Sequence, residues 1–193
     1  MPLPHNFTFF IGGRHDLKYF SDRKINYFIG FNHPGWSEPY EKDEIVEKLG
    51  VSIDNDNIHL FSVHDAFTKA HREMGLKMPS VELIDEILKH AWKIKAKLDK
   101  GEEVRAGYFC AAGISRSTAT CYIILCYLLG EWNEREALNL LVNKRPIARP
   151  NPLMVKIADD LMGRKYKMVS PLHNSLDLER ETDENNSTDI LLF

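Results

Sequence analysis

The stretch that decides the fold is residues 104 to 129, which read VRAGYF, CAAGISRS and TATCYIILCYLL in succession. Residues 104 to 109 form a short apolar run that is typical of a strand. The next eight residues contain the turn former Gly113, and residues 118 to 129 are apolar on nearly every side, as in a buried helix. This order of strand, loop and central helix predicts an α/β fold.

Further strands and helices are predicted on both sides of this unit. Short runs rich in β-branched and aromatic residues predict strands at residues 7 to 12, 25 to 31 and 57 to 63. Apolar residues that recur every three or four positions, together with N-cap residues such as Ser80 and Asn133, predict helices. These helices are expected at residues 37 to 49, 81 to 98, 133 to 145 and 152 to 162.

The composition is that of one ordinary globular domain. The chain has 193 residues, of which 44% are hydrophobic and 27% charged. The formal net charge is only -3, so the sequence lacks the basic field expected of a nucleic-acid-binding protein. Residues 175 to 193 carry six acids and one arginine. We therefore predict a single domain over residues 1 to 168 and an acidic, mobile tail over residues 169 to 193.

Cysteine usage and hydropathy favour a cytoplasmic protein. Three cysteines without a CxxC pair do not form a disulfide framework, which is typical of a reducing compartment. The N-terminus lacks the features of a secretion signal. The longest nearly apolar stretch, residues 119 to 129, is far shorter than the ~20 residues of a membrane-spanning helix. Neither a membrane nor a nucleic acid is therefore an expected partner, and the oligomeric state is left open.

The spacing Cys110-x5-Arg116-Ser117, between the predicted strand and helix, indicates a site for an oxyanion. Backbone N–H groups of such a loop can surround a phosphate-sized anion, and the helix N-terminus adds its positive end. The same environment favours a cysteine thiolate, which is a nucleophile. The planar guanidinium of Arg116 can hold two phosphate oxygens at once, and Ser117 can donate a hydrogen bond to the sulfur. The expected substrate-binding residues are Ala111, Ala112, Gly113, Ile114, Ser115 and Arg116.

These residues resemble the Cys-based protein phosphatases, and within them the dual-specificity phosphatase-like group, whose signature is HCxxGxxRS. The resemblance continues in the RPIARPN segment at residues 145 to 151 and covers residues 57 to 163. Residues 163 to 169 resemble the end of small bacterial members. The resemblance implies a protein-tyrosine-phosphatase-like fold with a central mixed sheet of four or five strands flanked by helices. It also implies hydrolysis of phosphomonoesters through a cysteinyl-phosphate intermediate, without cofactor or metal.

One residue departs from that signature. The position before the nucleophile, usually His, is Phe109. The histidine of the family helps to orient and acidify the cysteine, so its absence predicts a higher thiol pKa and slower turnover. It also leaves open an alternative function, in which the loop and Arg116 bind a phosphorylated partner and Cys110 does not react.

The resemblance further implies a carboxylic acid upstream of the nucleophile, which protonates the leaving oxygen. Asp65 is the candidate because it directly follows a predicted strand, as the family's acid does. It lies 45 residues before Cys110, farther than in compact members, and an insertion at residues 68 to 78 accounts for the difference. Three other acids between them are interpreted as solvated charges: Asp85, Asp99 and Glu102.

The variable loop positions bear on the substrate. Phosphoinositide phosphatases of the superfamily commonly carry lysine there, whereas this loop has none. Phosphotyrosine, with phosphoserine and phosphothreonine as further candidates, is therefore the expected substrate, on a phosphorylated protein or a small phosphomonoester. Sulfur transfer also uses a loop cysteine, but the Arg-Ser ending argues against it. Buried, inert thiols are expected at Cys121 and Cys126, and the histidines lack metal-binding spacing.

Overall fold

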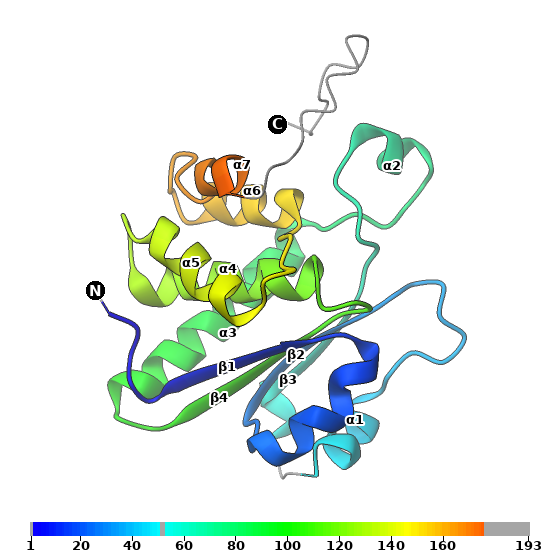
Figure 1. Ribbon diagram of the computed structural model, residues 1–193. Helices are drawn as coiled ribbons and strands as arrows, with labels where there is room; N and C mark the ends of the chain where they lie inside the picture. Colours follow the sequence, from blue (N-terminus) through cyan, green and yellow to red (C-terminus); the bar gives the residue numbers. More distant parts are fainter. Residues whose placement is uncertain (1, 51–52, 176–193) are drawn as a thin grey trace.

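A computed structural model describes residues 2–50 and 53–175 and shows a sheet with helices on both faces (Figure 1). The strands are β1 (Phe7–Gly12), β2 (Tyr27–Asn32), β3 (Ile58–Ser62) and β4 (Val104–Phe109). The helices are η1 (Arg14–Arg23), α1 (Lys42–Leu49), η2 (Asn55–Asn57), α2 (Lys69–Glu73), α3 (Val81–Asp99), α4 (Arg116–Leu129), α5 (Glu134–Lys144), α6 (Pro152–Leu161) and α7 (Ser170–Ser175). The predicted α/β class is confirmed.

The sheet has the strand order β1-β4-β2-β3, and each of its neighbouring pairs is parallel. The expectation of a mixed sheet is therefore wrong for the described residues. Each of β1, β2 and β3 is followed by a helical segment that returns the chain to the same end of the sheet before the next strand, and such crossovers produce parallel pairing. All four strands therefore end at one edge, where ligands of open α/β sheets bind.

Two apolar clusters cover the two faces of the sheet. On one face, α3 and α4 pack against the sheet and α5 and α6 pack on these helices, while η1 and α1 cover the other face (Figure 1). Helix α4 is central, since thirteen of its fourteen residues are buried. Successive side chains of β4 point to opposite faces of the sheet. Tyr108 therefore lies in the cluster on the α4 side, and Phe109 lies in the cluster on the α1 side. The parallel β4 is thus covered on both faces, which places its C-terminal residues deep in the molecule.

The expected start of the acidic tail at residue 169 does not match the structure. Val169 and Leu172 are buried in the larger apolar cluster, at 6% and 2% exposure, and α7 begins at Ser170. The apolar side chains of this segment lie on α5 and close the end of the core. The rest of the predicted tail, residues 176–193, lies outside the described residues. None of the described helices is long and apolar enough to cross a membrane.

The α3 helix carries a buried histidine that bears on stability. His90 is 1% exposed, and neither of its ring nitrogens has a hydrogen-bond partner among the described residues. Its ring packs edge-on against Tyr27 and His59, with centroids 5.1 and 5.0 Å away. Burial, with smaller contributions from the charges of His59 and Lys93, lowers the pKa of His90 to about 3. His90 is therefore neutral in the folded protein.

This burial predicts that acid destabilises the fold. The unfolded chain protonates His90 below about pH 6.5, whereas the folded chain resists protonation, so stability is present above pH 6.5 and lost as the pH falls towards 3. Between pH 7 and 5, this one residue is expected to lower the free energy of unfolding by about 2 kcal/mol. Urea unfolding of the native chain and of His90→Leu at both pH values measures the effect. An equal loss of stability in both proteins would contradict it.

Candidate active site

The Cys-x5-Arg loop leaves the C-terminal end of the central strand β4 and runs into the N-terminus of α4. Cys110 is 2% exposed, and its Sγ accepts a hydrogen bond from the backbone N–H of Gly113 at 3.2 Å. The Ser117 hydroxyl lies 3.2 Å from the same sulfur. The loop therefore curls around the thiol and presents donors to it, as a thiolate requires.

Opposing effects act on the pKa of Cys110. Burial alone raises it, because a thiolate loses water. The hydroxyl and backbone N–H of Ser117, the backbone N–H of Ile114 and the charge of Arg116 outweigh burial, so that the pKa lies below its ordinary value. The loop thus favours the thiolate although Phe109 stands where the family has histidine.

Ser117→Ala is expected to raise the pKa of Cys110, because the Ser117 hydroxyl stabilises the thiolate more than the neutral thiol. The pH dependence of alkylation by iodoacetamide measures this value, since only the thiolate reacts. Ser62→Ala, at an exposed position, is the matched control. If the alkylation rate has its inflection at the same pH in Ser117→Ala and in the native chain, the hydroxyl does not stabilise the thiolate.

Arg116 is almost fully buried, at 2% exposure, and points across the ends of two strands. Its Nη1 donates to the carbonyl of Val63 at 2.6 Å and lies 3.5 Å from that of Asn32. Its Nε is buried and has no partner among the described residues. A buried guanidinium nitrogen without an acceptor is costly, so this donor favours an oxyanion in the loop.

The outer side of the loop is held by residues that the sequence motif does not include. Arg145 donates to the carbonyls of Gly113 and Ala112, each at 3.2 Å, and lies 3.8 Å from the Asp16 carboxylate. Gly113 has φ +69°, and a Cβ there would lie 2.6 Å from the backbone of the β1 end. Arg149 also braces the loop, because its backbone N–H donates to the carbonyl of Ile114. Arg145 could have been identified from its place in the RPIARPN segment.

Asp65 lies beside the loop, as expected. Its Oδ1 accepts hydrogen bonds from the Ser115 hydroxyl at 2.6 Å and from the Asn151 amide at 2.8 Å. Its Oδ2 has no partner among the described residues, so one oxygen is anchored and the other is available. The long spacing to Cys110 is spanned by a segment with the short helix α2, which projects from the body of the molecule (Figure 1).

The other acids between Asp65 and the nucleophile lie on the surface. Asp85 pairs with Lys89 at 2.9 Å, and Asp99 pairs with Lys95 at 2.8 Å, both within α3. Glu102 pairs with Lys97 at 2.7 Å. Their role as solvated charges matches the expectation.

The residue in place of the family's histidine belongs to an aromatic cluster. Phe109 is fully buried, with its ring centroid 6.2 Å from that of Phe28 and 5.5 Å from that of Tyr40. A histidine here would place an ionisable ring among apolar groups. Phe109 therefore contributes to the core, and the thiolate depends on the other side of the loop.

The remaining thiols lie in α4 and are inert. Cys121 and Cys126 are fully buried, and burial raises the pKa of each. Among residues 2–50 and 53–175, no three His, Cys, Asp or Glu side chains are grouped to hold a metal ion.

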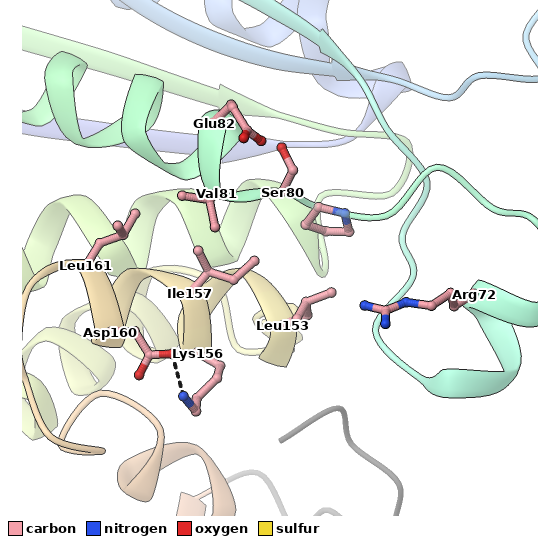
Figure 2. Close-up of a pocket in the computed structure, with 10 residues that line it drawn as sticks. Arg72, Ser80, Val81, Glu82, Leu153, Lys156, Ile157, Asp160 and Leu161 are labelled. Carbon is pink, nitrogen blue, oxygen red and sulfur yellow. Dashed lines mark hydrogen bonds and ion pairs between the residues drawn. The ribbon is translucent and has the colours of Figure 1, made fainter. Parts of the chain in front are cut away.

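A groove of about 580 Å³ lies between α2, the start of α3 and α6. Figure 2 shows its apolar wall, formed by Val81, Leu153, Ile157 and Leu161, with Arg72 extending towards it from α2. Neither the nucleophile nor Arg116 lines this groove. This groove is therefore distinct from the Cys-x5-Arg loop at the end of β4.

Comparisons with solved structures identify the fold. The chain is similar to Tk-PTP in its active form, with a TM-score of 0.51, 23% identity, and coverage of 82% of this chain and 92% of that one. It is also similar to human DUSP28 (TM-score 0.50, 17% identity, 81% and 94% covered). PTPMT1 in complex with PI(5)P gives a TM-score of 0.53 at 15% identity, with 82% and 94% covered. No protein-family model matches the chain, and no curated protein is significantly similar in sequence.

The chain therefore has the fold of the protein tyrosine and dual-specificity phosphatases, as its motif predicted. The similar structures are phosphatases, and Cys110 and Arg116 fit their Cys-x5-Arg motif. Because these identities are low, the residue roles rest on the geometry of this site.

Proposed function

We propose that this protein is a Cys-dependent phosphatase that hydrolyses phosphomonoesters in two steps. The Cys110 thiolate attacks phosphorus, the ester oxygen leaves with a proton from Asp65, and a cysteinyl phosphate forms. Water then attacks the phosphorus and gives a proton to the Asp65 carboxylate, the sulfur leaves as the thiolate, and inorganic phosphate is released. In this proposal Cys110 is the nucleophile, the Cys-x5-Arg loop is the oxyanion cradle, and Asp65, which lies beside the loop, is the acid.

The observation that carries this proposal is the set of donors around one buried sulfur. Cys110 accepts from Gly113 N–H and lies beside the Ser117 hydroxyl, while the unpartnered Nε of Arg116 is buried in the same region. A binding module needs the cradle but not a thiol with a lowered pKa. The lowered pKa of Cys110 therefore favours catalysis over the binding alternative.

The substrate that we propose is a phosphoprotein bearing phosphotyrosine, with phosphoserine and phosphothreonine as further candidates. The loop between Cys110 and Arg116 carries no lysine to meet the extra phosphates of an inositide. We also propose a reducing, cytoplasmic location, since none of the three cysteines is in a disulfide and a catalytic thiol must stay reduced.

Hydrolysis of 4-nitrophenyl phosphate from pH 5 to 8, with a metal chelator present, tests this function. We expect turnover that is the same with and without chelator. Absence of turnover together with tight binding of tungstate would favour the binding module instead.

Asp65→Asn is expected to lower kcat for phenyl phosphate by about 10²-fold, because the poor leaving group needs a proton. The loss for 4-nitrophenyl phosphate is expected to be smaller, because its leaving group is stable as an anion. Asp85→Asn, the surface acid in α3, is the matched control and should retain full activity. Equal losses for both substrates would remove Asp65 from the role of acid.

A further inference from the structure

Two histidines lie at the mouth of the candidate site, and the proposed reaction does not use them. His33 directly follows β2, and His64 lies between Val63 and the acid Asp65. Their ring centroids are 5.0 Å apart, with the rings nearly perpendicular. Both side chains are partly exposed, so a ligand can reach them.

The pair is tied to the reactive loop through Arg116. The two carbonyls that its Nη1 faces belong to Asn32 and Val63, the residues immediately before the two histidines. Burial lowers the pKa of His33, and His64 and the charge of Arg116 lower it further, so that the guanidinium acts on this ring. The histidines therefore stand next to the group that holds the scissile phosphate in our proposal.

The hydrogen bonds of the pair determine its tautomer. Nδ1 of His33 accepts from the backbone N–H of Gly35 at 3.0 Å, and Nδ1 of His64 accepts from that of Lys77 at 3.0 Å. A neutral imidazole that accepts at Nδ1 carries its proton on Nε2. Among the described residues neither Nε2–H has an acceptor, so each ring offers one donor.

Both rings are held in place before any ligand binds. The Asn32 side chain forms two hydrogen bonds with the backbone of Tyr40, at 2.9 and 3.0 Å, and so closes the loop that carries His33. The backbone N–H of His64 donates to the carbonyl of Lys77, which completes a reciprocal pair with the bond to its ring. Preorganised donors of this kind bind an anion at little cost in side-chain entropy.

Arg14 places a positive charge on the same side of the site as His33. The guanidinium of Arg14 lies 4.5 Å above the ring of Trp36, and the Trp36 ring lies 6.4 Å from that of His33. The backbone N–H of Arg14 donates to the carbonyl of Ala111 in the reactive loop. Within the described parts of the chain, no carboxylate forms an ion pair with Arg14. The side of the site beside His33 therefore carries the positive charge of Arg14.

We propose that His33 and His64 bind a second anionic group of the substrate, a carboxylate or a phosphate, beside the phosphate that is hydrolysed. This inference rests on the proposed function and narrows its substrate class to phosphomonoesters with an acidic neighbour. The two Nε2–H groups donate to that neighbour, and Arg14 supplies the charge at the same rim.

The test compares 3-carboxyphenyl phosphate and 1,3-phenylene bisphosphate with 3-carbamoylphenyl phosphate, which lacks the second charge. We expect the native chain to prefer the charged substrates by about tenfold in kcat/KM. Whichever of the two charged substrates has the larger kcat/KM identifies the second anionic group as a carboxylate or a phosphate. A native chain without preference would overturn the inference, whereas failure to hydrolyse all three substrates would overturn the proposed function itself.

His33→Asn and His64→Asn are the decisive variants, because an asparagine oxygen can replace Nδ1 as acceptor while the Nε2–H donor is lost. Each is expected to reduce the preference severalfold, and the double variant is expected to abolish it. His5→Asn, at an exposed position near the N-terminus, should leave the preference intact. Variants that slow the charged and uncharged substrates by the same factor would contradict the assignment, because the histidines would then act on the chemistry or the fold.

Discussion

Cys110→Ser is expected to abolish hydrolysis of aryl phosphates, with a loss of about 10⁴-fold or more in kcat. A serine hydroxyl stays protonated at neutral pH, whereas the pKa of Cys110 lies below its ordinary value. The serine oxygen can still accept from the backbone N–H of Gly113, so the cradle and its affinity for tungstate should persist. Steady-state hydrolysis and calorimetric titration with tungstate together measure the two effects.

Cys126→Ala is the matched control for this variant. Its thiol is fully buried in α4, and burial raises its pKa, so it takes no part in the reaction. We expect this variant to hydrolyse aryl phosphates at the native rate wherever it is folded. Turnover that survives in Cys110→Ser would show that another group forms the bond to phosphorus.

Arg116→Lys has the second largest expected effect, a loss of about 10³-fold in kcat/KM with weakened tungstate binding. Lysine retains the charge but not the planar fork, and it cannot supply the donor at the position of the buried Nε. Thermal unfolding of the variant checks the fold, since Nη1 also joins the ends of β2 and β3.

Arg149→Lys is the control for the arginine, because among the described residues the side chain of Arg149 donates only to the carbonyl of its neighbour Ala148. The backbone N–H of Arg149 donates to the carbonyl of Ile114 in the loop, and lysine preserves that hydrogen bond. We expect near-native kcat/KM for this control. An Arg116→Lys variant that is folded and also near-native would exclude bidentate phosphate binding by Arg116.

The elements around the motif were predictable because each has a strong local pattern. β4 was predicted at its observed bounds, and α3 to within one residue, since apolar periodicity and the Ser80 N-cap mark its limits. The segments η1 and α2 were not predicted. Their residues are largely polar and their form depends on tertiary contacts, such as the packing of Leu17 and Phe20 on the sheet.

The site was predictable to the extent that its residues are neighbours in sequence. Cys110, Arg116 and Ser117 lie in one loop, and the spacing alone indicated their chemistry. Asp65 was placed by resemblance, but its anchoring by Asn151 joins positions 86 residues apart and required the fold. The bracing by Arg145 and the pairing of His33 with His64 also depend on contacts between distant segments.

The most direct measurement of the central claim is the mass of the protein during turnover. The native chain is mixed rapidly with phenyl phosphate, quenched in denaturant and analysed by mass spectrometry of the peptide that contains Cys110. The proposed reaction predicts the added mass of one phosphoryl group on Cys110, and none in Cys110→Ser. Sustained hydrolysis without any phosphoryl group on this peptide, or with the group on another residue, would contradict the account.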